Sequence, residues 1–263
     1  MLQRIACGVI SCPMLAALMR HGRLNSRSKA ALWAAMAGLL LGAAFACGPT
    51  TPVAVTTSSP STASPLPTSS QLRLVVLGDS IASGTDSYGG QGTSGWPAIV
   101  AQKLGLLSLL SAQPGTGYTK DYSSGVAYPA RVNDVIAMRP AILIVEGSRN
   151  DVDGVATRRV AAEVLGKLHN ALPQTKILVI GPFYLDSADS HTTPVNEAVK
   201  AAALSLGLTY VDTLKARWFT GSASRFIGGD GIHPTDEGHV YIANLLVPLV
   251  TKLLPAGYVI PKQ

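Results

Sequence analysis

The chain has 263 residues, of which 47% are hydrophobic and 14% are charged, which suits one or two folded domains and excludes a chain that is disordered throughout. Its net charge of +6 comes almost entirely from residues 1–70, which hold five Lys and Arg and no Asp or Glu. Residues 71–263 hold 16 basic and 15 acidic side chains, a net charge of +1, and no run of basic residues. Because phosphate binding requires a concentrated basic surface, we expect no nucleic-acid partner.

The first segment in chain order, residues 1–46, has the pattern of a signal peptide or an N-terminal anchor. A basic stretch precedes a charge-free apolar run over residues 30–46, which is slightly shorter than the about 20 residues that span a bilayer. The run ends in Ala-Phe-Ala, a pattern typical of signal-peptide cleavage, and Cys47 follows directly. Three interpretations stay open. Cys47 is lipidated after cleavage, as the resemblance of this stretch to a bacterial lipobox implies, or it begins a secreted protein, or the segment stays uncut as an anchor. Each predicts an extracytoplasmic protein, and two predict attachment to a membrane through Cys47 or the N-terminal segment.

Residues 47–70 form a predicted tether that is rich in Pro, Ser and Thr and has no charged residue. Such a composition cannot bury enough apolar surface to offset the loss of chain entropy, so we expect this segment to be disordered. Cys47 is also the last cysteine in the chain, after Cys7 and Cys12. Residues 71–263 can therefore form neither an internal disulfide nor a thiolate metal site.

From residue 71 onward, short apolar runs alternate with helix-like stretches. The predicted strands are residues 72–77, 106–110, 141–145, 177–180 and 209–211. The predicted helices are residues 94–104, 129–138, 157–171, 193–206 and 236–253. The apolar runs are continuous rather than alternating, which indicates strands covered on both faces. The alternation predicts one α/β domain over residues 71–263, a three-layer α/β/α sandwich with a mostly parallel sheet of about five strands.

Four polar clusters lie after these strands or before the last helix, where parallel sheets bind their ligands. They are Gly78-Asp79-Ser80, Gly115–Thr119, Glu146–Asp151 and Asp230–His233. In this order they resemble the sequence blocks of the SGNH (GDSL) hydrolases: Gly-Asp-Ser, a loop glycine, Gly-x-Asn-Asp and Asp-x-x-His. The resemblance covers about residues 72–254 and includes the tract Gly95-Trp96-Pro97-Ala98 on the first predicted helix.

This resemblance implies a serine ester hydrolase that works through an acyl-serine intermediate. Ser80 is the predicted nucleophile, and its hydroxyl needs an adjacent base. His233 is that base, since an imidazole can take and return a proton, and Asp230 holds the ring in the required tautomer. We also expect Ser80 to lie where a strand turns into a helix, because a helix N-terminus favours developing negative charge.

The resemblance further implies an oxyanion hole made of the backbone N–H of Ser80, the backbone N–H of a loop glycine and an Asn side chain. Asn150 matches the Asn of the third block. For the glycine we choose Gly117, because Thr116-Gly117-Tyr118-Thr119 looks like the Ser-Gly-x-Thr of the family. Gly115 is the alternative.

The third block departs from the family pattern. It has one additional residue between Gly147 and Asn150, so Asn150 serves as a donor only if the loop absorbs the insertion. Arg149, beside it, either holds an anionic group of the substrate or pairs with Asp151 or Asp153. Of these two, we expect the pairing.

Other enzyme and binding classes fit less well. An α/β-hydrolase has Gly-x-Ser-x-Gly around its nucleophile, whereas Ala82 occupies the fifth position here. The chain has neither a Walker A motif nor a complete Gly-x-Gly-x-x-Gly, which argues against a flavodoxin-like nucleotide binder. The histidines lack a recognised metal-ligand spacing, so we expect no metal and no cofactor. We interpret three of them as surface or capping residues: His169, His191 and His239.

Two functional alternatives stay open beside the hydrolase. One is a catalytically inactive tethered module that binds an envelope glycan or lipid, and the other is an acyltransferase on the same fold. The expected partner is a small-molecule or glycan ester, with the substrate class undecided between lipid acyl and acetyl-sugar esters. Five aromatic residues near the expected rim either contact the substrate or belong to the core: Tyr88, Trp96, Tyr118, Phe183 and Tyr184.

Overall fold

The computed structural model describes residues 71–84, 95–120, 126–184 and 192–262, which belong to one structural unit, Pro65–Gln263. The predicted leader, the predicted tether and Cys47 lie outside the described residues. Within the described ranges, no helix is both long enough and apolar enough to cross a membrane.

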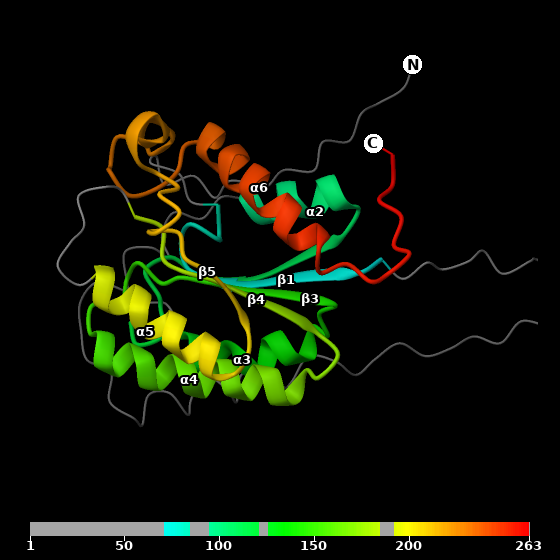
Figure 1. Cartoon of the computed structure of the whole chain (residues 1–263), viewed down its shortest axis with the longest axis horizontal. Helices are drawn as coiled ribbons and strands as arrows, with labels where there is room; N and C mark the ends of the chain where they lie inside the picture. Colours follow the sequence, from blue (N-terminus) through cyan, green and yellow to red (C-terminus); the bar gives the residue numbers. More distant parts are fainter. Residues whose placement is uncertain (1–70, 85–94, 121–125, 185–191, 263) are drawn as a thin grey trace, which may run out of the picture. The chain divides into compact units, whose positions relative to one another are not determined.

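Five parallel strands form one sheet in the order β2-β1-β3-β4-β5 (Figure 1). They are β1 (Arg73–Gly78), β2 (Leu107–Ala112), β3 (Ile142–Glu146), β4 (Lys176–Ile180) and β5 (Thr209–Val211). Val75 of β1 lies opposite Leu109 on one side and Leu143 on the other. From β1 the chain continues to β2 on one side, and it then crosses to β3 on the other side of β1. The loops after β1 and β3 therefore meet at a topological switch point.

Helices cover both faces of this sheet, which confirms the predicted α/β/α sandwich (Figure 1). One face carries α2 (Trp96–Leu104) and α6 (Asp236–Thr251). The other carries α3 (Tyr128–Ala137), α4 (Gly154–Ala171) and α5 (Thr192–Ser205). A short 3-10 helix, η1 (Gly221–Phe226), precedes α6 and was not predicted.

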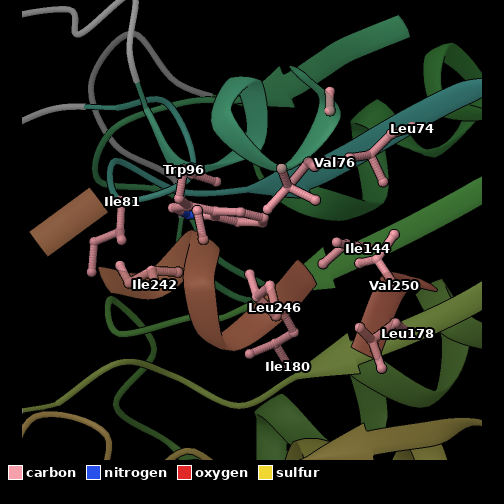
Figure 2. Packing of buried hydrophobic residues seen from close by; sticks show 14 of the residues in the cluster. Leu74, Val76, Ile81, Trp96, Ile144, Leu178, Ile180, Ile242, Leu246 and Val250 are labelled. Carbon is pink, nitrogen blue, oxygen red and sulfur yellow. The ribbon is translucent and has the colours of Figure 1, made fainter. Parts of the chain in front are cut away.

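Alternate residues of the central strands enter two separate cores. Val76 and Ile144 pack with Trp96, Ile242 and Leu246 of α2 and α6 (Figure 2). Their neighbours along the strands face α3, α4 and α5. The central strands are therefore apolar on both faces between their end residues, as the continuous runs indicated. The edge strand β2 is only partly buried.

One expectation about the segment after β1 is wrong, because no helix begins at Ser80. Residues 79–84 form a single turn, in which the N–H of Ser83 donates to the carbonyl of Asp79 at 3.0 Å. Gly84 ends this turn with a positive φ of 81°. Among the described residues the first helix is α2, which begins at Trp96. Ser80 therefore lies at one helical turn rather than at the N-terminus of a helix.

Candidate active site

Ser80, His233 and Asp230 form a hydrogen-bonded chain at the carboxyl edge of the sheet. The Oγ of Ser80 lies 2.9 Å from Nε2 of His233, although the two residues are 153 positions apart. The other ring nitrogen, Nδ1, lies 2.6 Å from Oδ2 of Asp230. Ser80 follows β1, and the other two residues precede α6, so the packing of α6 against the β1 side of the fold brings them together. This arrangement can transfer the hydroxyl proton to the imidazole and hold the ring while it does so.

A local turn holds Asp230 and His233 in place. Oδ1 of Asp230 accepts hydrogen bonds from the backbone N–H groups of Ile232 at 2.9 Å and His233 at 3.0 Å. Gly231 permits this turn, since its φ of 69° lies in the left-handed region. Thr235 caps the N-terminus of α6 by accepting the N–H of Gly238 at 3.1 Å. The short spacing of the two residues is thus fixed by contacts within the same segment.

The charge of Asp230 follows from the same contacts. Burial alone raises the pKa of Asp230, but hydrogen bonds from the backbone and ring of His233 and from the N–H of Ile232 outweigh it and lower the pKa. An ionised Asp230 favours the tautomer with the proton on Nδ1 of His233. Nε2 is then available to accept the proton of Ser80.

Asn150 reaches the neighbourhood of Ser80 in spite of the additional residue in its block. Its Nδ2 donates to the carbonyl of Thr116 at 2.9 Å and lies 3.4 Å from Oδ2 of Asp79. Gly147 adopts a φ of 106°, which a side chain would disfavour, and its neighbour Ser148 is buried with its Oγ donating to the same carbonyl of Thr116. The loop therefore absorbs the insertion and directs the Asn150 amide toward the turn that carries Ser80.

Gly117 occupies a position without space for a side chain. A Cβ there would lie 2.5 Å from Oγ of Ser148 and 2.6 Å from Oδ2 of Asp151. Its N–H donates to the carbonyl of Lys120 at 2.9 Å. This bond has to open before Gly117 can act as the predicted oxyanion donor. By contrast, the N–H of Ser80 donates to no acceptor among the described residues.

Asp151 anchors the loop that contains Gly117. Its carboxylate accepts the N–H groups of Tyr118, Thr119 and Lys120 at 2.9, 2.7 and 3.0 Å and the hydroxyl of Thr119 at 2.6 Å. In the sequence, Asp151 is the Asp of the third block and a candidate partner of Arg149, and its role as an anchor of the preceding loop was not predicted. The Asn-Asp pattern identifies Asp151 in the sequence. The residues that donate to its carboxylate lie about thirty positions earlier, and the spacing of the motif does not predict them.

The expected pairing of Arg149 with Asp151 or Asp153 is wrong. Asp151 is used by the preceding loop, and Asp153 caps the first turn of α4. The guanidinium of Arg149 instead lies over the ring of Tyr184, with Cζ 4.8 Å from the ring centroid. The hydroxyl of Tyr184 donates to the carbonyl of Arg149 at 3.0 Å. Arg149 forms no ion pair within the described part of the chain.

The aromatic residues expected near the rim are core residues wherever the structure describes them. Trp96 is fully buried under α6 (Figure 2). Three others are less than 7% exposed: Tyr118, Phe183 and Tyr184. Tyr88 lies outside the described residues. The described aromatics therefore support the loops around Ser80 rather than forming an open stacking surface.

The histidines outside the triad differ from one another. His239 is buried rather than at the surface, and its Nδ1 accepts the N–H of Trp96 at 3.3 Å, which ties α6 to α2. His169 is exposed in the last turn of α4, and His191 lies outside the described residues. In the described ranges, no three His, Cys, Asp or Glu residues gather in a way that could hold a metal ion.

A groove of about 890 Å³ lies between the first turns of α4 and α5. Its apolar lining consists of Val152, Val155, Ala162, Pro194 and Ala198. No member of the triad lines it. The groove is therefore separate from the chemistry at Ser80.

Comparison with known proteins agrees with this geometry. Residues 76–241 match the GDSL-like Lipase/Acylhydrolase family. The GDSL lipase Rv0518 of Mycobacterium tuberculosis is 29% identical over 191 residues, which covers 68% of this chain and 81% of that protein. Among solved structures, the lipase/acylhydrolase from Enterococcus faecalis has a TM-score of 0.59 at 18% identity, covering 73% of this chain and 99% of the other. A family two carbohydrate esterase from Clostridium thermocellum has a TM-score of 0.54 at 15% identity, with 69% and 64% covered. At these identities the two structures show a shared fold.

Proposed function

Since the chain belongs to the GDSL-like lipase/acylhydrolase family and is a serine ester hydrolase, we propose that Ser80, His233 and Asp230 are its catalytic residues and that it acts outside the cytoplasm. The observation that carries this assignment is the continuous chain of hydrogen bonds from Ser80 Oγ through the His233 ring to Asp230. A serine that only stabilises a turn does not require a histidine ring held in a fixed orientation beside its hydroxyl.

The reaction follows from the position of each proton. His233 Nε2 accepts the proton of Ser80 while Oγ attacks the ester carbonyl carbon, and Asp230 stabilises the resulting imidazolium. The imidazolium then gives its proton to the leaving alcohol, which departs and leaves an acyl group on Ser80. In the second half, His233 takes a proton from a water molecule while the water oxygen attacks the acyl carbon. The bond from that carbon to Oγ then breaks, the acid leaves, and the imidazolium returns its proton to Oγ of Ser80.

The negative charge on the carbonyl oxygen needs donors on the side of Ser80 away from His233. We assign two groups, the backbone N–H of Ser80, which has no acceptor among the described residues, and the amide of Asn150, which has to release the carbonyl of Thr116 to act as a donor. Gly117 joins them when its bond to Lys120 opens. Removing one donor of this kind from a serine hydrolase costs about 100- to 1,000-fold in kcat.

The test of this function is hydrolysis of short p-nitrophenyl esters. We expect Ser80→Ala to lose at least about 10,000-fold in kcat. Ser205→Ala is the matched control, because its hydroxyl only donates to the carbonyl of Ala202 at the end of α5, and it should retain wild-type activity. A Ser80→Ala variant as active as the wild type would contradict the assignment. A wild type that binds esters without turnover would indicate the inactive binding module.

The proposal also concerns the substrate class, which is either a lipid acyl ester or an acetyl-sugar ester. Lipid acyl and acetyl-sugar esters both fit a serine ester hydrolase, and the relatives include a lipase and a carbohydrate esterase. A panel of p-nitrophenyl esters of increasing acyl length, run beside acetylated sugars, separates the two. Acyl transfer to an added alcohol that outpaces hydrolysis would instead indicate an acyltransferase.

The extracytoplasmic location rests on the sequence of the leader, which ends in Ala-Phe-Ala before Cys47. If Cys47 is lipidated, Cys47→Ser should move the protein from the membrane fraction to the soluble fraction and remove the lipid mass from the mature N-terminus. Unchanged fractionation with an intact leader would favour the uncut anchor. Recovery of the full chain in the cytoplasm would contradict export.

A further inference from the structure

Two carboxyl groups are buried directly behind Ser80 and take no part in the triad. Asp79 follows β1, and Glu146 ends the neighbouring strand β3, and both are 0% exposed. The N–H of Asp79 donates to Oε2 of Glu146 at 3.2 Å. Gly78 makes this approach possible, because a Cβ there would lie 2.7 Å from the same Oε2. The other oxygen of Glu146, Oε1, has no hydrogen-bond partner among the described residues.

The two carboxyl groups have different surroundings. Asp79 accepts three N–H donors: Ile81 on Oδ1 at 2.9 Å, and Arg149 at 3.3 Å and the Asn150 side chain at 3.4 Å on Oδ2. A group surrounded by donors is suited to be the ionised carboxylate. Glu146 accepts a single N–H and is suited to be the protonated acid. Two adjacent carboxyl groups in a buried site cannot both be ionised without a large desolvation penalty.

We propose that Asp79 and Glu146 share one proton, that it resides on Glu146, and that the Asp79 carboxylate thereby positions the Asn150 amide and the Ser80 turn for catalysis. This inference rests on the proposed function and deepens it. Neither residue contacts the ester. Asp79 acts through Asn150 on one side and through Ile81 on the other, and Glu146 acts by keeping the charge on Asp79, so both are positioning residues.

The electrostatics of the pocket agree with this assignment. Burial raises the pKa of Glu146 well above its usual range, and the adjacent Asp79 raises it further. Burial raises the pKa of Asp79 to about 6, against the N–H groups of Ile81 and Arg149, which lower it. The other titratable groups that face the pair are His233, Asp151, Arg131, Tyr118 and Tyr128. Above about pH 6 the pair thus holds one charge, on Asp79, and below that pH its hold on Asn150 weakens.

The test makes the same carboxyl-to-amide change at both positions. Glu146→Gln replaces a neutral acid by a neutral amide that can still donate to Asp79, so it should keep at least about a third of the wild-type kcat at pH 8. Asp79→Asn places an amide nitrogen among three N–H donors, so it should lower kcat at least about 30-fold with KM within about threefold. Glu146→Ala, which leaves the N–H of Asp79 without its acceptor, should lower kcat as Asp79→Asn does.

A second measurement does not depend on ester hydrolysis. Folding raises the pKa of this carboxyl. The folded state therefore loses stability as the pH rises from the pKa of the group in the unfolded chain to its higher pKa in the folded protein, whereas Gln does not titrate. The Tm of Glu146→Gln minus that of the wild type should therefore grow from pH 4.5 to pH 8. This comparison stays decisive if Asp79→Asn fails to fold.

Two results would overturn the inference. If Glu146→Gln loses as much kcat as Asp79→Asn, the required charge is not confined to Asp79. If the Tm difference is flat with pH, the two groups share no proton, whether or not the wild type hydrolyses esters. If the wild type is inactive but the Tm difference still grows with pH, the proposed function is overturned, and the positioning role with it. The shared proton between Asp79 and Glu146 is then still supported.

Discussion

At the scale of single residues, Asp230 uses its two carboxylate oxygens for different tasks. Oδ1 holds the local turn through the N–H groups of Ile232 and His233, and Oδ2 holds the ring of His233. An amide at this position can preserve the first task, because its oxygen still accepts the two N–H groups. Its nitrogen then faces Nδ1 and opposes the required tautomer.

We therefore expect Asp230→Asn to keep the Tm of the wild type within a few degrees and to lower kcat by about 100- to 10,000-fold. The measurement is steady-state hydrolysis of p-nitrophenyl acetate beside a thermal unfolding curve. Unchanged kcat would show that Asp230 has no part in orienting His233.

The triad is the part of the site that short spacings predict well. Asp230 and His233 are joined by a turn made within four residues, and Ser80 meets them because a β1 end and an α6 start share one edge of the sheet. The contacts of Asp79, Asp151 and Arg149 were not predicted. Each depends on the conformation of loops that come from distant parts of the chain, and sequence spacing carries no information about which donor a loop presents to a buried carboxylate.

At the scale of elements, α6 fixes the position of His233. The helix starts directly after the Asp-x-x-His segment, and Thr235 caps it with a hydroxyl that accepts the N–H of Gly238. Pro234, next to His233, forms an antiparallel bridge with Ile227. A loosened cap thus disturbs the backbone that carries the imidazole.

Thr235→Ala should destabilise the protein by about 1 kcal/mol, because the first turn of α6 loses its cap. It should also lower kcat severalfold through added freedom at His233. Thr235→Ser, which keeps the hydroxyl, is the matched control and should restore both values. The two variants are compared by urea unfolding and by ester hydrolysis, and an equal effect of both would show that the hydroxyl is not what holds this segment.

The strands and helices were largely predictable because their signals are local. Continuous apolar runs predicted strands buried on both faces, and the ends of the observed strands differ from the predicted ones by at most two residues. The differences lie at ends and in short turns. Asp153 caps α4 four residues before the predicted start of that helix, and the left-handed backbone of Gly84 ends the turn after Ser80. The ends of helices and turns depend on single capping or glycine residues, and the periodicity of apolar residues contains no information about them.

At the scale of the whole folded unit, stability comes from two apolar cores on opposite faces of the sheet. Alternation of strand and helix predicted parallel strands and two covered faces. It did not predict the strand order, because the path of each crossover depends on helix packing that the pattern does not contain.

Leu165→Ala in α4 should destabilise the protein by about 2–5 kcal/mol, because Leu165 is 0% exposed and its removal leaves a cavity under α4. Val155→Ala in the same helix is the control, since Val155 is 85% exposed and its change should stay within about 0.5 kcal/mol. Denaturant unfolding of both variants measures the difference. Similar values for the two would contradict the assignment of Leu165 to a close-packed core.

The central claim is that the hydroxyl of Ser80 is the group activated by His233. The most direct measurement is to treat the full-length protein with a fluorophosphonate, digest it and locate the modified residue by mass spectrometry. We expect modification at Ser80, with labelling lost in Ser80→Ala and strongly slowed in His233→Ala. Modification of a different residue, or undiminished labelling of Ser80 in His233→Ala, would contradict it.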